Sequence, residues 1–316
     1  MPILNAFSGV ATIFLLGFIG FYLARSGMFP QQAIATLPWF TTTVAIPPFL
    51  MRTATETITK EQLASLLFET RIPCFSILIA FVSAILLSRL LRIAPKRKAM
   101  FQVGIATSNT MSIGLPINLA LFGSASLPYV LLYFVTNAIF FWTIGCTTIA
   151  RSGNAVDAPI FSLDTLKRIL SPPIVGFCLG LLLVFLDFRI PAFLDNTFKY
   201  LGDMVIGLTT LYIGMMISSI RREELSIDRD IIVATVGRML FSPMIVLFLT
   251  WLMPVEPLMR NVFIIQSSLP VMINAAVLSA YYKTDAQYAT ILISVTTLLS
   301  LITIPLYMMF VTLCLP

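Results

Sequence analysis

The sequence predicts an all-α membrane protein of 10 transmembrane helices, arranged as a 5+5 inverted repeat. Of the 316 residues, 58% are hydrophobic and only 11% are charged, and the mean hydropathy of +0.96 lies far above that of soluble proteins. Apolar runs of membrane-spanning length recur from one end of the chain to the other. Two of these runs, the fourth and the ninth, are interrupted at corresponding places.

The predicted spans are separated by short loops that contain most of the charged residues. The first span has no basic leader and no small-residue cleavage site, so we expect a retained helix and not a signal peptide. The spans are residues 3–23, 33–51, 73–91, 99–122, 128–150, 170–187, 191–218, 230–253, 261–282 and 286–313.

The chain divides into two halves of similar length. Residues 1–150 form the first five-helix repeat, residues 151–169 a polar central cytoplasmic loop, and residues 170–316 the second five-helix repeat. The fourth and ninth spans each carry small polar residues before a proline and an asparagine after it. Because each half has an odd number of spans, a second copy enters the membrane from the opposite side, which predicts inverted topology.

Span two contains the tandem Pro47-Pro48, so we expect local unwinding near Ile46. In span seven, Gly202, Gly207 and Gly214 predict close packing against another helix.

The interruptions of spans four and nine are the predicted substrate site. Inside hydrocarbon, an interrupted helix exposes backbone groups, and it is tolerated only where it lines a cavity or is covered by protein. Proline lacks an amide hydrogen, so we expect each second half-helix to begin at Pro116 or Pro270. Alternatively, these prolines only kink core helices. The candidate substrate-binding residues are Ser108, Asn109, Thr110, Ser112, Gly114, Pro116, Gln266, Ser267, Ser268, Pro270, Asn274 and Arg238.

The chemistry of a broken helix favours ions. The N-terminal ends of half-helices present amides to an anion, whereas freed carbonyls and C-terminal ends favour a cation. Because the spans contain almost no Asp or Glu, we expect the substrate to be a small organic anion.

Arg238 is the only basic residue deep within a predicted span. An ionisable group inside the membrane predicts a function, here as the counter-charge of a carboxylate substrate or in an ion pair with Asp203. The alternatives are a structural pair or a side chain that extends toward the membrane interface. The sequence leaves these interpretations open.

Basic residues predict the orientation of the chain. Thirteen of them fall in one alternate set of loops and six in the other, and the richer side is cytoplasmic, so both termini lie outside the cytoplasm of a multi-pass plasma (inner) membrane protein. Short basic runs that flank apolar spans exclude nucleic acid as a partner. The richer set is Arg25, Arg89, Arg92, Lys96, Arg97, Lys98, Arg151, Lys167, Arg168, Arg221, Arg222, Arg229 and Lys283; the other is Arg52, Lys60, Arg71, Arg189, Lys199 and Arg260.

The composition excludes several classes of protein. Histidine is absent and no cysteine cluster has metal-ligand spacing, so we expect no metal site, no cofactor and no catalytic centre. No Gly-Lys-Ser/Thr phosphate-binding sequence is present, so ATP cannot drive transport on this chain. The coupling ion, Na⁺ or H⁺, and uniport without one stay open.

Spans four and nine, together with Pro47-Pro48 and the stretch from Gly207 to Met216, resemble the auxin efflux carrier family. That family includes the plant PIN proteins and bacterial malate and malonate permeases. The resemblance implies a bile-acid-symporter-like fold, in which broken helices four and nine cross between a scaffold and a transport unit. Because the long hydrophilic loop of many plant members is missing, a bacterial carrier is the nearer relative.

The expected function is that of a secondary active transporter or uniporter for a small organic anion. The resemblance implies a mono- or dicarboxylate such as malate or malonate, or an auxin-like indole acid, moved across the plasma membrane by elevator-type alternating access. The alternative is a membrane-embedded channel or sensor that uses the same broken-helix site. The expected partners are the substrate and the lipid bilayer, and whether the protein forms a homodimer stays open.

Overall fold

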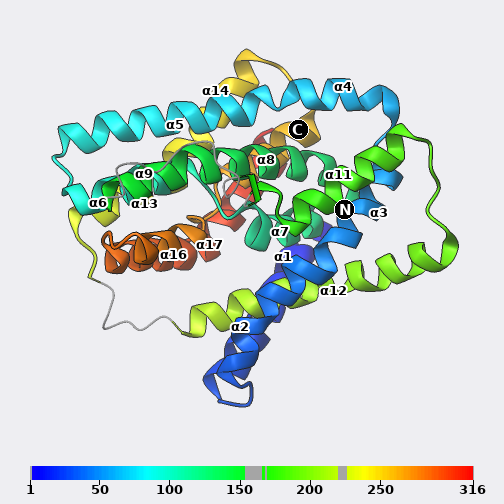
Figure 1. The fold of residues 1–316 in the computed structure, drawn as a ribbon, viewed down its shortest axis with the longest axis horizontal. Coiled ribbons are helices and arrows are strands. Elements are labelled where there is room, and N and C mark those ends of the chain that lie inside the picture. Colours follow the sequence, from blue (N-terminus) through cyan, green and yellow to red (C-terminus); the bar gives the residue numbers. More distant parts are fainter. Residues whose placement is uncertain (1, 154–165, 168, 220–225, 316) are drawn as a thin grey trace. The chain divides into compact units, whose positions relative to one another are not determined.

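The computed structural model describes residues 2–153, 166–167, 169–219 and 226–315, and their regular secondary structure is entirely helical (Figure 1). The one β feature in this part of the chain is an isolated bridge between Ser108 and Val271. Most of the predicted central loop, residues 151–169, lies outside the described residues.

Five helical stretches of the described chain are long and apolar enough to cross a membrane, by length and composition. Three shorter apolar helices cover residues 15–25, 110–122 and 172–185. The predicted all-helical membrane class is therefore confirmed. The five long stretches are residues 67–90, 124–152, 192–218, 229–252 and 286–312.

The chain folds into two compact units, and each unit takes segments from both halves of the sequence. Unit 1 comprises residues 1–69, 111–132 and 170–220, and unit 2 comprises residues 70–110, 133–169 and 221–316. The units are thus assembled from alternating stretches of the chain, and the break in the fourth span marks a boundary between them.

Unit 1 is built on close helix pairs, with α1 against α12 and α3 against α11. Glycines of α12 permit close approach: a Cβ atom on Gly214 would lie 1.8 Å from the carbonyl oxygen of Gly17 in α1, and one on Gly202 would lie 2.6 Å from Phe49 in α3. The packing role predicted for these two glycines is confirmed, whereas Gly207 has nothing within 4 Å. The helices are α1 (Pro2–Arg25), α2 (Gln31–Phe40), α3 (Ile46–Thr57), α4 (Lys60–Glu69), α7 (Leu115–Phe122), α11 (Pro172–Phe185) and α12 (Ala192–Ser218).

The prediction of unwinding near Ile46 is wrong. The helix runs on from α2 to α3 through one π-helical turn, Thr41–Ala45, in which the amide of Ile46 donates to the carbonyl of Thr41. This wider turn shifts the hydrogen-bond pattern directly before Pro47-Pro48, so the two missing amide hydrogens fall at the start of α3, where a helix tolerates them. The short helix α4 was not predicted either.

Unit 2 contains both halves of span nine and the first half of span four. It includes most of α8, and α5 packs on α6 and α14 within it. The helices are α5 (Arg71–Leu90), α6 (Pro95–Ala106), α8 (Leu127–Phe140), α9 (Cys146–Ser152), α13 (Arg229–Val236), α14 (Ser242–Leu252), α15 (Pro257–Ser267), α16 (Asn274–Tyr281) and α17 (Ala286–Cys314), with π-helical turns η4 (Phe141–Gly145) and η6 (Gly237–Phe241).

Candidate functional site

Both predicted helix breaks are present. The helix α7 (Leu115–Phe122) begins with Pro116 in its first turn, close to the predicted position, whereas α16 does not begin at Pro270. After α6 the chain is extended over residues 107–109, and a π-helical turn, Thr110–Gly114, leads into α7. After α15 the irregular stretch runs over residues 268–273, so Pro270 lies inside the break and α16 begins at Asn274. A proline prevents a helix from passing through it unchanged, but other contacts set where the helix stops.

Those contacts join the two breaks to each other. Ser108 and Val271 form an antiparallel bridge, and the amide of Asn109 donates to the carbonyl oxygen of Pro270 at 2.9 Å. Backbone groups that a continuous helix would satisfy internally are therefore satisfied across the crossing point. This pairing explains how two interrupted segments are stable in an apolar interior.

A side chain of the next span supports each break. Asn137 of α8 accepts from the amide of Ser108 at 3.1 Å and donates to the carbonyl of Ser108 at 3.0 Å. Thr296 of α17 accepts from the amide of Val271 at 3.3 Å. Sequence reasoning missed both residues. The available signal was Asn137, an amide side chain in an otherwise apolar segment, because a buried amide needs polar partners.

The candidate residues fall into both units. Ser108, Asn109, Thr110, Gln266, Ser267, Ser268 and Pro270 are buried in unit 2, and Asn274 is an exposed residue of the same unit at the start of α16. Ser112, Gly114 and Pro116 belong to unit 1. The carbonyl oxygen of Gly114 accepts from the side-chain Nδ2 of Asn118 at 2.8 Å. The structure thus brings the two breaks together in unit 2.

Several buried polar atoms beside the crossing have no hydrogen-bond partner among the described residues. Both polar atoms of the Gln266 amide are unpaired, as are Nδ2 of Asn109 and Oγ of Ser108. Gln266 is 0% exposed and Asn109 is 5% exposed. An unpaired buried polar group costs about 1–3 kcal/mol, so these atoms make the crossing the candidate site.

The other buried glutamine shows that the lack of hydrogen-bond partners is particular to Gln266. Gln102 of α6 is also buried, at 6% exposed, but its Nε2 donates to Oγ of Ser88 at 2.8 Å. The half-helices before the two breaks therefore each carry one buried glutamine, and only the glutamine of α15 has both polar atoms unpaired.

Arg238 is fully buried on the π-helical turn η6. Its Nη1 donates to the carbonyl oxygen of Ile105 at 2.9 Å, and its Nη2 donates to the carbonyl of Ser267. These contacts favour a structural role, because they are to backbone carbonyls and not to a carboxylate. Full burial contradicts the alternative of a side chain that reaches the membrane interface. Asp203, the predicted ion-pair partner, is an exposed residue of unit 1.

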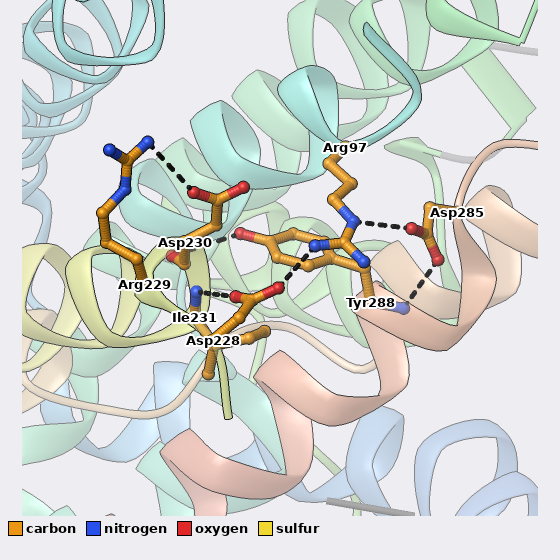
Figure 2. Close-up of polar contacts among 7 residues, drawn as sticks. All are labelled: Arg97, Asp228, Arg229, Asp230, Ile231, Asp285 and Tyr288. Carbon is orange, nitrogen blue, oxygen red and sulfur yellow. Dashed lines mark hydrogen bonds and ion pairs between the residues drawn. The ribbon is translucent and has the colours of Figure 1, made fainter. Parts of the chain in front are cut away.

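An ion cluster joins three helix N-termini at one end of unit 2 (Figure 2). Arg97 near the start of α6 donates to Asp285 at 2.7 Å and to Asp228 at 2.5 Å, and its guanidinium lies 5.1 Å from the ring centre of Tyr288. Each carboxylate also caps a helix: Asp228 accepts from the amide of Ile231 in α13, and Asp285 accepts from the amide of Tyr288 in α17.

Two pKa values reflect this arrangement. The hydrogen bond to Asp285 raises the pKa of Arg97 above its usual value, with a further contribution from Asp228. Partial burial acts to raise the pKa of Asp228, but the Ile231 amide and Arg97 outweigh it and hold that pKa below the usual value. Arg97 and Asp228 are therefore both charged at neutral pH.

Comparisons with known proteins agree with these features. A family model described as "Membrane transport protein" matches residues 5–308. An uncharacterized transporter of Methanocaldococcus jannaschii is 23% identical over 302 residues, which cover 94% of this chain and 96% of that protein. A Rhizobium meliloti protein named "Putative malonate transporter" is 24% identical over 299 residues, 93% of this chain and 92% of that protein.

The family model covers nearly the whole chain. The two relatives match this chain over almost their full lengths, and both carry transporter names. Such a protein is embedded in the membrane with several helices and moves a small molecule, which places it among transporters and not among enzymes. The chain therefore belongs to the membrane transport protein family, the auxin efflux carrier family that its broken helices resemble.

Proposed function

We propose that this transporter is a secondary carrier or uniporter for a small organic anion, and that the anion binds at the crossing of the two helix breaks in unit 2. The observation that carries the proposal is the set of unpaired buried polar atoms there, above all the amide of Gln266. The amide nitrogens of Gln266 and Asn109 are donors, which a carboxylate oxygen can accept.

The charge of this region favours an anion. The N-terminal end of α16 follows directly after the break and carries the partial positive charge of a helix N-terminus. No side chain caps it, and the amides of Ala275 and Ala276 donate only to the neighbouring carbonyls of Met272 and Ile273. No Asp or Glu occurs between Arg97 and Phe122 or between Pro257 and Lys283 to repel an anion. A dicarboxylate such as malonate fits this chemistry, and a relative carries malonate in its name.

The wider architecture belongs to the same proposal. Ten spans arranged as two inverted repeats, residues 1–150 and 170–316, would supply one broken helix from each repeat. The corresponding supports of the two breaks, Asn137 and Thr296, each lie on the span that follows the break, which agrees with such a repeat. The division into two compact units supports elevator-type alternating access, with one unit carrying the substrate. Location in the plasma membrane, with both termini outside, completes the proposal.

The experiment compares the two buried glutamines. Purified wild-type protein and the variants Gln266→Leu and Gln102→Leu are heated with and without malonate, malate, indole acids, cations and sugars. We expect wild-type protein to be stabilised by a carboxylate, since a ligand at 100 times its Kd adds about 2.7 kcal/mol to the folded state. Gln266→Leu should keep its ligand-free stability, because its amide has no partner to lose, but should lose carboxylate stabilisation.

Gln102→Leu is the matched control. It should lower stability, because the hydrogen bond that Oγ of Ser88 accepts from Gln102 is lost, and it should still respond to the carboxylate. Equal carboxylate responses in wild type and Gln266→Leu would contradict the proposed site. Stabilisation by cations or sugars alone would overturn the anion assignment. In liposomes, saturable counterflow of substrate distinguishes a carrier from a channel, whose flux grows linearly with concentration.

A further inference from the structure

The two half-helices that precede the breaks end where a cation would be expected to bind. A helix that stops leaves its last carbonyls without intrahelical partners and carries about half a negative charge at that end. In discontinuous membrane helices, such carbonyls and C-terminal ends coordinate Na⁺. Here α6 ends one residue after Ile105, and α15 ends at Ser267 itself.

Arg238 already occupies both ends. One side chain donates from Nη1 to the carbonyl of Ile105 and from Nη2 to the carbonyl of Ser267, and it does so at 0% exposure. An arginine is protonated at any physiological pH, so this is a permanent positive charge. One full charge between two half-charges of opposite sign balances the two helix ends.

The carbonyl of Ile105 has no acceptor capacity left. Besides Arg238 it accepts from Oγ of Ser242 at 2.9 Å, and a carbonyl oxygen has two lone pairs. A metal ion at this oxygen would have to displace one of these donors and would then lie beside the guanidinium charge.

We propose that Arg238 is a built-in cation that replaces a coupling ion at the two helix ends, so that carboxylate binding and transport by this chain need no Na⁺. The inference rests on the proposed function, because it concerns the ion balance of the same crossing. It also gives Arg238 a defined part as a positioning residue: it holds α6 and α15 in register and leaves the partial positive charge of α16 free for the anion.

The experiment measures the cation response of the protein with and without this guanidinium. Wild type, Arg238→Gln, Arg238→Lys and Ser242→Ala are heated at constant ionic strength in Na⁺, K⁺ or N-methyl-D-glucamine, each with and without malonate. For wild type we expect the same melting temperature in all three salts, and a malonate Kd that changes by less than about twofold. Uptake into liposomes should proceed at the same rate without Na⁺.

Arg238→Gln should melt lower and gain a response that wild type lacks. Na⁺, or millimolar guanidinium as a substitute for the missing side chain, should raise its melting temperature. Arg238→Lys keeps the charge and should stay indifferent to Na⁺. Ser242→Ala removes a neutral donor from the same carbonyl and should be less stable in every salt to the same extent.

Two results would overturn the inference. The first is that the stability, malonate affinity or uptake of the wild-type protein depends on Na⁺. The second is that the Arg238→Gln protein folds but its melting temperature does not respond to any cation. If Arg238→Gln does not fold, wild type and Arg238→Lys still decide, because Na⁺ dependence in either one rejects the built-in cation. The melting temperatures in the three salts can be compared without malonate, so this test does not depend on the carboxylate assignment. A failure of the carboxylate assignment is seen separately, as the absence of any wild-type response to carboxylates.

Discussion

Asn137 holds Ser108 by both ends of its side-chain amide, which accepts from the backbone N–H and donates to the backbone C=O of the same residue. A continuous helix would satisfy these two groups internally. The side chain of α8 thus replaces the helical hydrogen bonds of Ser108 and keeps the first break extended, where it can pair with Val271. The site depends on a residue outside the predicted motif.

Replacing Asn137 with Ala should therefore destabilise the protein and impair transport together. The buried amide of Ser108 would lose its partner, at a cost of about 1–3 kcal/mol. The carbonyl of Ser108 would keep only the hydrogen bond from the amide of Thr110. Thermal unfolding and liposome uptake measure the two effects. Thr143→Val is the control, because Thr143 donates only within its own span, to the carbonyl of Ile139. An Asn137→Ala protein as stable as Thr143→Val would show that the break does not need this support.

Arg97→Gln should loosen the end of unit 2 at which α6, α13 and α17 meet. The side chains of the cluster are partly exposed, so we expect a modest loss of about 0.5–2 kcal/mol in unfolding free energy, smaller at high salt. Lys96→Gln removes the neighbouring exposed charge and is the matched control. The prediction fails if both variants unfold alike in low and high salt.

The pH dependence of stability should contain a contribution from Asp228. Because its pKa is lower in the folded protein than in the unfolded chain, its ionised form stabilises the fold at neutral pH. That stability is present above the ordinary aspartate pKa of about 4 and is lost as the pH falls below it. Between neutral and acid pH, the melting temperature should therefore fall less steeply for Asp228→Asn than for wild type. Parallel curves for wild type and variant would contradict this assignment.

The orientation predicted from basic residues can be tested by labelling. Lys96 and Ser124 are both exposed, so a cysteine at either position is accessible to a reagent. In a variant without Cys74, Cys146, Cys178 and Cys314, an impermeant thiol reagent added to intact cells should label position 124 and not position 96. Labelling of position 96 from outside would show that the orientation is the opposite of the predicted one.

Sequence reasoning identified the broken segments and the start of α7 near Pro116, but it placed the start of α16 incorrectly. The proline rule is local and concerns a missing amide hydrogen, so it located a break near Pro116 and near Pro270. The actual ends depend on Asn109 donating to Pro270, on Asn137 and on the π-helical turn at Thr110–Gly114. These contacts connect residues up to about 160 positions apart, and no local pattern contains them.

By itself the sequence determined the membrane class, the helical content and the family. These follow from composition and from motifs within single spans, because a span in hydrocarbon must be apolar and must satisfy its backbone groups, as a long apolar helix does. Only the tertiary structure decided which groups Arg238 contacts and which polar groups are left unpaired. A buried guanidinium is stable wherever enough acceptors surround it, and the sequence does not show whether those acceptors are carboxylates or helix-end carbonyls. The fold provides Ile105 and Ser267, and it pairs Gln102 while leaving Gln266 without a partner.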